Sequence, residues 1–524
     1  MSTSFDAILI GAGHNSLACA AHLAAKGWRV GVFERVDTPG GAVKTKALTL
    51  PGFRHDWAAM NLSLFAGSPF FAAYKDELSS HGLEFAPVAN CFSSVFPDGR
   101  WLGISTDPIK TRAAIAGFSE PDAAQWDALI ADFPARAEDL FALLGNSLNK
   151  HAFAYFIFKM LRKNGFRGSA DLARFLISSP RAWLAETFET PEIRATLGAW
   201  GMHLDFAPDI AGGAMFPYLE AMANPSFGMV LGKGGADTIV RALVAMIAAR
   251  GGQVECGAEV AQVTTAAGRA TGVRLADGRE VTATRAVIAN VAPGALPRLL
   301  DGGSGNARFD AGMARFAHAP GTMMIHLAMD ALPDWTASAD LKRFAYVHLA
   351  PSLDQMARTY QQAKAGLLPD EPVIVVGQPT AIDPSRAPEG KHVLWLQVRM
   401  VPATIQGDAA GTIAATDWQA AKEAMAERAL DILERYAPGT RARILARHVV
   451  GPLDLEADNP NLVGGDQVCG SHHLSQHFLF RPLRGHHDGS TPVDGLHLTG
   501  AGVWPGGGVG AGPGFLLARR LAGK

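Results

Sequence analysis

The sequence has little cysteine and almost no net charge, and each shortage excludes a class of protein. Four cysteines, Cys19, Cys91, Cys256 and Cys469, are scattered over 524 residues without the spacing of a metal site or of paired disulfides. We therefore expect reduced, structural thiols in a reducing compartment and no bound metal. A formal net charge of −2 argues against a protein built to bind nucleic acid.

Long apolar runs are also missing. No uninterrupted run reaches the roughly 20 residues of a transmembrane helix. The first strand-like run, residues 7–10, begins so close to Met1 that a cleavable signal peptide would have to include it. We expect a cytoplasmic protein, attached at most to the surface of a membrane. With 524 residues, 48% of them hydrophobic, the chain is too long for one simple core, and two domains are expected.

The N-terminal stretch predicts a strand, a tight glycine turn and a helix. Residues 7–10 suit a strand buried on both faces of a parallel sheet. Gly11 lets the chain reverse, and Gly13 lets a diphosphate approach the bare backbone. The helix expected over about 15–26 points its N-terminus, with unpaired N–H groups and a positive dipole end, at that diphosphate.

Ser16 and Glu34 complete this pattern. The third glycine of the usual fingerprint is replaced by Ser16, which is small enough for close packing of helix on strand. A second strand over 29–33 ends at Glu34, whose carboxylate suits a ribose hydroxyl. Strand, turn, helix, strand and acid in this order predict dinucleotide binding. The alternative is a glycine loop in an unrelated α/β protein.

Two further glycine-rich segments lie far apart in the chain. Gly40 and Gly41 follow Glu34 closely and give the backbone another place of close approach to a ligand. Residues 495–518 read as a strand, a glycine loop and a helix near the C-terminus. A nicotinamide enzyme with one nucleotide fold does not need this second loop, whereas a flavin held at both ends does.

Hydrophobic patterns assign the rest of the chain to sheets and helices. The strands over 253–290 suggest a return to the sheet begun by residues 6–34. The expected elements are a hairpin over 92–104, mainly helix over 107–222, a helix over 237–249, strands over 253–255, 259–264, 272–275, 279–281 and 285–290, an antiparallel sheet with one covered face over 320–400, and a helix over 417–436.

One helical segment, residues 150–164, is aromatic and basic together. One interpretation is a helix that lies on an anionic membrane or frames the mouth of a lipophilic tunnel. The other is a buried helix with a basic, solvated end, and we favour this second interpretation.

Taken together, these motifs resemble the phytoene desaturase-like flavoprotein family, which includes carotenoid desaturases, retinol saturase and the pyridine nucleotide-disulphide oxidoreductase domain-containing proteins. Residues 11–16 resemble its glycine motif, and Glu34-Arg35 with Gly40-Gly41 resembles its extended FAD signature. Residues 494–502 and 505–510 resemble its closing flavin motif, and Gln476 with Arg481-Pro482 resembles the segment before it. The resemblance is vague over about 105–225 and 300–455, where a substrate would be chosen.

The resemblance implies a set of contacts to a non-covalently held FAD. The diphosphate would lie at the first glycine turn, the adenosine ribose at Glu34, the adenine at Val260, and the ribityl chain and isoalloxazine at the C-terminal loop. The implied cofactor-binding residues are Gly11, Gly13, Asn15, Ser16, Glu34, Arg35, Gly40, Gly41, Ala42, Val43, Val260, Gly502, Gly507, Gly508 and Val509.

The resemblance also implies the fold class. We expect an α/β protein with a Rossmann-like FAD-binding domain of the glutathione reductase/amine oxidase type and a discontinuous α+β substrate domain. The FAD-binding domain would comprise residues 1–90, 225–300 and 490–524. The substrate domain would comprise 91–224 and 301–489, with 105–222 mainly helical.

The catalytic residues are less clearly marked. A base is needed if the substrate C–H bond lies beside a carbonyl, whereas a lipophilic tunnel and the flavin suffice for unactivated carbons. The predicted catalytic set is His472, His473 and Trp504, and His203, Asp205 and His477 are further candidates. His473 and His477 have the spacing of one helix face. For each histidine the alternative is a structural or surface position, and His14 is expected to be structural.

The leading hypothesis is an FAD-dependent oxidoreductase that desaturates CH–CH bonds of a lipophilic or alicyclic substrate by hydride transfer to flavin N5. The alternatives are an amine-type oxidase, a redox-neutral isomerase that uses reduced FAD, and a non-catalytic flavin-binding assembly protein. The expected partners are a lipophilic or cyclic small molecule and oxygen or a quinone as electron acceptor. Contact with a membrane surface is an open alternative, and the sequence leaves the oligomeric state undetermined.

Overall fold

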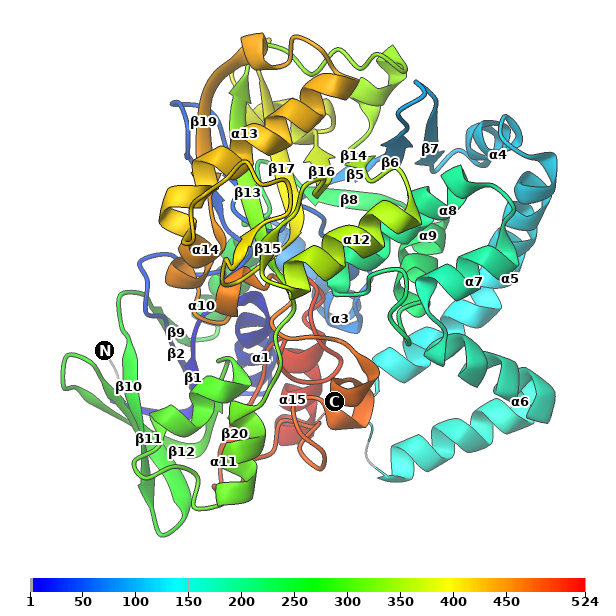
Figure 1. Ribbon diagram of the computed structural model, residues 1–524. Coiled ribbons are helices and arrows are strands. Elements are labelled where there is room, and N and C mark those ends of the chain that lie inside the picture. Colours follow the sequence, from blue (N-terminus) through cyan, green and yellow to red (C-terminus); the bar gives the residue numbers. More distant parts are fainter. Residues whose placement is uncertain (1–2, 147, 149, 524) are drawn as a thin grey trace.

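The computed structural model describes residues 3–146, 148 and 150–523, and it contains two large sheets (Figure 1). In the first sheet, β12, β1, β2 and β9 are parallel neighbours, β20 pairs with the end of β12, and β10 and β11 extend the sheet as an antiparallel meander. Its strands are β1 Ser4–Ile10, β2 Val30–Phe33, β9 Gln253–Glu255, β10 Val260–Ala266, β11 Arg269–Leu275, β12 Glu280–Ala289 and β20 Leu496–Leu498.

Successive side chains of β1 point alternately into two different apolar cores, so the first sheet is buried on both faces. Ala7 and Leu9 pack into the core beneath α1 (His14–Ala25), α10 (Thr238–Ala249) and α15 (Gly512–Ala522). Ile8 and Ile10 point to the opposite side, into the core formed with the β10–β11 meander. The predicted strand–turn–helix–strand unit and the predicted return of the chain to this sheet are therefore confirmed.

The second sheet has the order β19-β13-β17-β16-β14-β6-β7. All its neighbouring pairs are antiparallel except β14 and β6. The strands are β6 Asn90–Val95, β7 Trp101–Ser105, β13 Gly321–Met329, β14 Tyr346–Leu349, β16 Val373–Gly377, β17 His392–Val401 and β19 Ile444–Val450. Short two-stranded pairs join β3 Thr45–Lys46 to β4 His55–Asp56, β5 Phe85–Val88 to β8 Met229–Gly232, and β15 Leu367–Leu368 to β18 Gly407–Asp408.

The expectation that this antiparallel sheet has one covered face is wrong. Every residue of β13 is buried. Met323 and Ile325 pack towards α13 (Trp418–Tyr436), whereas Met324 lies in the core shared with the helical segment. Because helices cover both faces, these strands lack the alternation of apolar and polar residues that is typical of a sheet with one solvated face.

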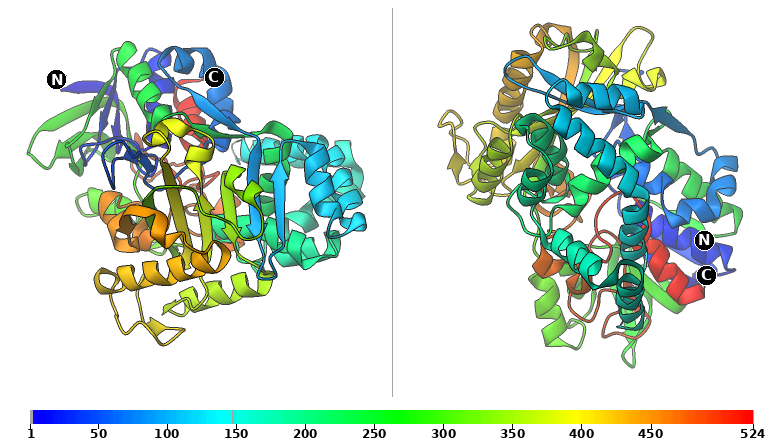
Figure 2. Two further views of the ribbon diagram at one scale, coloured as in Figure 1. Left: turned by 90° about the horizontal axis from the view of Figure 1, so that it is seen from above. Right: turned by 90° about the vertical axis from the view of Figure 1, so that its right-hand side faces the viewer.

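The predicted helical region over 107–222 is confirmed, and it forms one side of the molecule, away from the β10–β12 meander (Figures 1 and 2). Its helices are α4 Pro108–Ala116, α5 Glu120–Leu144, α6 Lys150–Ile177, α7 Pro180–Thr187, α8 Pro191–Gly198 and α9 Met215–Phe227, with the 3-10 helix η1 Ala199–Leu204. The remaining helices are α2 Ser63–Ala66, α3 Pro69–Ser80, α11 Ala307–Ala314, α12 Leu353–Lys364 and α14 Pro452–Asp458.

The aromatic and basic segment at residues 150–164 is not the buried helix that we favoured from the sequence. It forms the first part of α6, which bends at Gly165, where φ is +66°. Tyr155 is 68% exposed, Phe158 59% and Phe166 83%. The side chains of Lys150 and Ala152 lie outside the described residues. Apolar residues here fall on several sides of the helix, so one contact with the body cannot bury them all.

Each of the two sheets is built mainly from the segments that the sequence assigns to one of the two domains. Strands of the first sheet come from residues 1–90, 225–300 and 490–524, and most of the second sheet comes from 91–224 and 301–489. We keep this division as our proposal for the domain boundaries.

Candidate flavin site

The carboxyl ends of β1, β2 and β12 lie at one edge of the first sheet, where a pocket of about 280 Å³ opens. Ligands of open parallel sheets bind at this edge, because helix N-termini and loops converge there. Nine residues assigned to the cofactor from the sequence line it: Gly11, Gly13, Asn15, Glu34, Arg35, Gly41, Ala42, Val260 and Gly502.

The glycine turn and the start of α1 have the features of a diphosphate site. Gly11 has φ of +85°, and Gly13 is the N-cap of α1. Among the described residues, Asn15 Oδ1 and Ser16 Oγ are buried without a hydrogen-bond partner. Burial lowers the pKa of His14 to about 4, so this first turn carries no positive side chain at neutral pH. The Ser16 hydroxyl, which can donate a hydrogen bond, and the free N–H groups of the helix end fit a phosphate group.

Two backbone N–H groups hold the Glu34 carboxylate in place. Its Oε2 accepts the Ala12 N–H at 2.7 Å, and its Oε1 accepts the Val36 N–H at 3.2 Å. Each carboxylate oxygen retains a lone pair. These two backbone donors fix the carboxylate beside the glycine turn, as the strand–acid spacing predicts.

The Gly40-Gly41 loop packs directly on the first glycine turn. Gly40 donates its N–H to Ala12 O at 2.8 Å, and a Cβ built on Gly41 would lie 3.2 Å from the Cα of Gly13. Lys44 follows this loop. Its Nζ lies 2.8 Å from a carboxylate oxygen of Asp458, and both side chains line the pocket. The sequence analysis missed this ion pair because its partners lie more than 400 residues apart in the chain.

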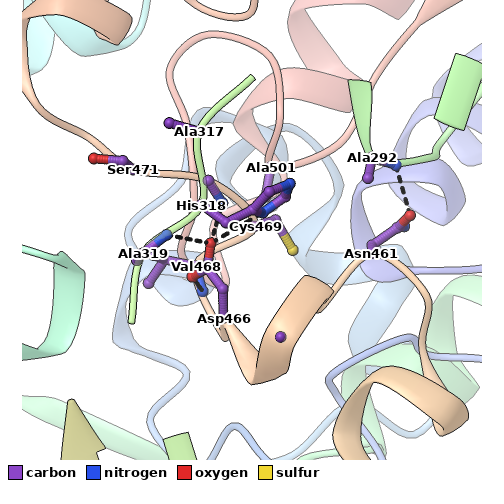
Figure 3. A network of polar contacts seen from close by, with 12 residues as sticks. Ala292, Ala317, His318, Ala319, Asn461, Asp466, Val468, Cys469, Ser471 and Ala501 are labelled. Carbon is purple, nitrogen blue, oxygen red and sulfur yellow. Dashed lines mark hydrogen bonds and ion pairs between the residues drawn. The ribbon is translucent and has the colours of Figure 1, made fainter. Parts of the chain in front are cut away.

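Two asparagines that the sequence analysis also missed join the edge of the first sheet to residues 301–489, and Figure 3 shows one of them, Asn461, beside Ala292. Asn461 Oδ1 accepts the Ala292 N–H at 2.7 Å, and Asn461 Nδ2 donates to Asn290 O at 2.9 Å. Asn290 follows β12 at the pocket edge, and a Cβ built on Gly13 or Gly500 would overlap its side-chain amide. The one sequence signal for Asn290 was its place directly after a buried parallel strand.

A buried carboxylate and a buried guanidinium shape the segment next to the C-terminal loop. Asp466 accepts the Ala319 N–H at 3.0 Å (Figure 3) and the Gly470 N–H at 2.6 Å. Arg481 is fully buried and donates to backbone carbonyls of Ser471 at 2.8 Å and Ala501 at 2.7 Å. These bonds hold residues 466–471 against the loop that follows β20.

His472 and His14 fasten the C-terminal glycine loop itself. His472 Nε2 accepts the Gly507 N–H at 2.9 Å, and His14 Nε2 lies 3.3 Å from Gly508 O. Burial holds the pKa of His472 well below its usual range, so the ring is neutral. Gly507, Gly508 and Val509 thus lie next to α1, but outside the pocket lining described above.

The other candidate side chains are engaged in contacts with the protein. His473 Nε2 lies 3.3 Å from Asp205 Oδ2 and 3.2 Å from the Tyr360 hydroxyl, and His203 Nε2 lies 3.3 Å from His348 Nε2. Burial raises the pKa of Asp205.

The helix face expected for His473 and His477 does not exist. A 3-10 helix of three residues, Leu474–Gln476, separates these two histidines. His477 is fully buried and packs against Trp504. The residues before this turn, Gly470-Ser471-His472-His473, are weak helix formers, so the turn does not extend into a longer helix.

Trp504 lies apart from the pocket at the sheet edge. Its Nε1 donates to Asn146 O at 3.0 Å, and its ring lines a second cavity, of about 300 Å³, between the end of α5 and α15. The catalytic assignment of His472, His473 and Trp504 stays a prediction. Among the described residues, no group of three His, Cys, Asp or Glu side chains is placed to hold a metal ion.

A Rossmann-like sheet with a pocket at its parallel edge and a second large sheet defines a two-sheet flavoprotein fold. The chain matches the family described as flavin containing amine oxidoreductase over residues 17–510. This protein therefore belongs to that family.

Relatives and solved structures agree with this assignment. The chain is 29% identical to pyridine nucleotide-disulfide oxidoreductase domain-containing protein 2 of Mus musculus, over 97% of this chain and 92% of the relative. It is 26% identical to the phytoene desaturase (neurosporene-forming) of Cereibacter sphaeroides, over 99% and 94% of the two chains. An oxidoreductase structure from Methanosarcina mazei has a TM-score of 0.61 at 19% identity, covering 99% of this chain and all of the other. The predicted family resemblance, fold class and FAD cofactor are confirmed.

Proposed function

We propose that the protein is a dehydrogenase that introduces a double bond between neighbouring carbons of a lipophilic or alicyclic substrate. The observation that supports this most is the full-length similarity to phytoene desaturases in a chain whose pocket suits a dinucleotide. A bound flavin accepts the two electrons removed in such a reaction. Oxygen or a quinone would then reoxidise it.

In this proposal the residues of the pocket hold FAD without a covalent bond. Gly11, Gly13 and the start of α1 bind the diphosphate, Glu34 binds the adenosine ribose, and Val260 contacts the adenine. His472, Arg481 and His14 fix the C-terminal loop, where Gly507 to Val509 would lie by the isoalloxazine. Amine oxidation is the second candidate, because the family description names amine oxidoreductases.

Absorption spectroscopy under anaerobic conditions tests the proposal. The purified holoprotein is expected to show flavin bands and to be bleached by at least one lipophilic substrate with formation of a C=C bond. Bleaching by cyclohexylamine, with release of a carbonyl product, would instead favour amine oxidation. A protein that neither carries nor takes up FAD would contradict the cofactor site.

We also propose that α6 contacts an anionic membrane surface. Exposed aromatic side chains beside Arg162 and Arg167 suit the interfacial region of a bilayer, because the rings insert among the headgroups and the cations attract anionic lipid. In the part of the chain that the structure describes, no helix is long and apolar enough to cross a membrane.

Co-sedimentation with vesicles tests the contact. The double substitution Phe158→Ser and Phe166→Ser is expected to weaken binding to anionic vesicles about tenfold or more, because two exposed rings are lost. Ile109→Ser, which removes a side chain 79% exposed on α4, is the matched control and leaves binding unchanged. Equal binding of the double variant and the parent would contradict the proposal.

A further inference from the structure

Helix α9 presents one ionisable side chain, Glu220, on an otherwise apolar face. Phe216, Leu219, Glu220 and Ala223 are half-buried, whereas Tyr218 and Met222 on the other side are buried. The spacing of the four half-buried positions places them on one side of the helix, which we call the α9 face. A carboxylate on this face has no charged neighbour within α9.

The α9 face lies beside the C-terminal glycine loop. The Phe216 and His472 rings have centroids 6.2 Å apart, and His472 accepts the Gly507 N–H. Glu220 follows Phe216 by one helical turn, a rise of about 6 Å. Leu64 of α2 is 49% exposed although it lies against the same loop, since a Cβ built on Gly508 would be 2.9 Å from Leu64 Cδ1. Accessible side chains therefore border the loop from two elements.

Glu220 is poorly satisfied by the protein. Among the described residues, its one hydrogen bond comes from Asn224 Nδ2 at 3.4 Å. Burial raises the pKa of Glu220 to about 7. Burial also raises the pKa of Tyr346 on β14, and the charges of Asp56 and Glu220 add to this effect, so the phenol and the carboxylate share one environment.

Among the described residues, two other titratable groups near α9 are buried without a hydrogen-bond partner: the His477 ring, whose centroid lies 6.0 Å from that of Phe216, and the hydroxyl of Tyr218 on the opposite side of α9. His203 of η1 lies against His348, and His472 accepts the Gly507 N–H. Arg136 of α5 lies over the ring of Tyr218, which belongs to the opposite side of α9. Glu220 is the ionisable side chain that α9 itself contributes to this face.

We propose that Glu220 accepts the proton lost by the substrate, and that the substrate carries a carbonyl group next to the C–H bond that loses it. This inference rests on the proposed dehydrogenation and names its substrate class. The C–H bond breaks, the proton moves to a Glu220 carboxylate oxygen, and the electron pair stays on the substrate as an enolate. The neighbouring carbon loses its hydrogen with the bonding pair, for which FAD held in the pocket would be the two-electron acceptor, and a C=C bond conjugated with the carbonyl remains.

Chemistry favours this class over a pure hydrocarbon. A hydrogen beside a carbonyl is acidic enough to be taken by a carboxylate whose pKa lies near the working pH, whereas an unactivated C–H bond is not. A hydrocarbon would also leave Glu220 with only the long hydrogen bond from Asn224, and sites built around a polar group discriminate against ligands that cannot pair with it.

The test compares ketones with hydrocarbons of the same skeleton on the anaerobic holoprotein. The probes are cyclohexanone, 2-decalone and 2-undecanone against cyclohexane, decalin and undecane. We expect at least one ketone, and no hydrocarbon, to bleach the flavin, at a rate that rises as the pH passes about 7. E220Q should slow bleaching about 100-fold or more at unchanged FAD content, and E220D should recover part of the rate. E186Q, at an exposed carboxylate on α7, is the matched control.

Each outcome bears on the inference. Bleaching by hydrocarbons as fast as by ketones, or by E220Q as fast as by the parent, overturns it and leaves the dehydrogenation standing. Bleaching by amines alone overturns both. Without any substrate, the infrared difference between parent and E220Q should contain a carboxylic acid band that titrates near pH 7. A carboxylate ionised throughout pH 5–9 would contradict the assignment of Glu220.

Discussion

Replacing Gly13 by valine is expected to give a folded protein that has lost FAD. A Cβ at this position would lie 2.8 Å from Asn290 Nδ2, and the added methyl groups would project into the pocket where we propose that the diphosphate binds. We expect the affinity for FAD to fall at least about 100-fold, which corresponds to about 2.8 kcal/mol. Quenching of flavin fluorescence by apoprotein measures the affinity, and far-ultraviolet circular dichroism reports the fold.

Gly117→Val is the control for this substitution. Gly117 has ordinary helical backbone angles at the end of α4, and an added Cβ there would meet its nearest neighbour at 3.4 Å. This variant should bind FAD as the parent does. Gly13→Val with the parent's affinity would show that the diphosphate lies elsewhere.

Local pattern was enough to predict the first unit of the fold. The apolar run, the two glycines and the acid at Glu34 specify a strand, a turn, a helix and a second strand within 34 residues, and their contacts lie close in the chain. The C-terminal unit has the same order, β20, a glycine loop and α15, and could be predicted for the same reason. Nine residues predicted to bind the cofactor line one pocket.

Contacts between distant segments could not be predicted in this way. Lys44 meets Asp458, and Asn461 meets Asn290, because the chain returns from the second sheet to the edge of the first. No single segment contains a sign of these pairings. Glu220 escaped notice for a related reason. One glutamate in an apolar helix is unremarkable until the structure shows which side of that helix borders the glycine loop.

Besides the sheet that is covered on both faces, two expectations about secondary structure and burial were wrong. His473 and His477 have helical spacing, but the chain between them makes only a short 3-10 turn. The apolar content of residues 150–164 favoured burial, yet Tyr155 and Phe158 remain exposed, because the cluster of Leu143, Leu148 and Trp504 covers only the side of α6 that carries Phe153 and Phe156. In both cases tertiary context overrode the local pattern.

Substitution of Arg386 by methionine is expected to cause the largest loss of stability. Arg386 belongs to residues 301–489 and is fully buried, whereas its partners Asp56 and Gly232 belong to residues 1–90 and 225–300. It forms an ion pair with Asp56 and donates to Gly232 O at 2.5 Å. Asp56 is itself buried, and its Oδ1 accepts the Ala236 N–H at 2.8 Å. Methionine would leave the Asp56 carboxylate and a backbone carbonyl without their partner, a cost of about 3–5 kcal/mol in the free energy of unfolding.

The matched control is Lys391→Met, which breaks an ion pair with Asp330 in which both side chains are well exposed. Exposed pairs contribute about 0.2–1 kcal/mol, so this variant should unfold close to the parent. Urea unfolding followed by tryptophan fluorescence compares the three proteins. If Arg386→Met unfolded no earlier than Lys391→Met, the buried guanidinium would not hold the two segments together. If it unfolds much earlier, an ion pair between residues 330 positions apart in the chain stabilises the fold, and Asp56 links that pair to Thr45 in the segment that follows the Gly40-Gly41 loop.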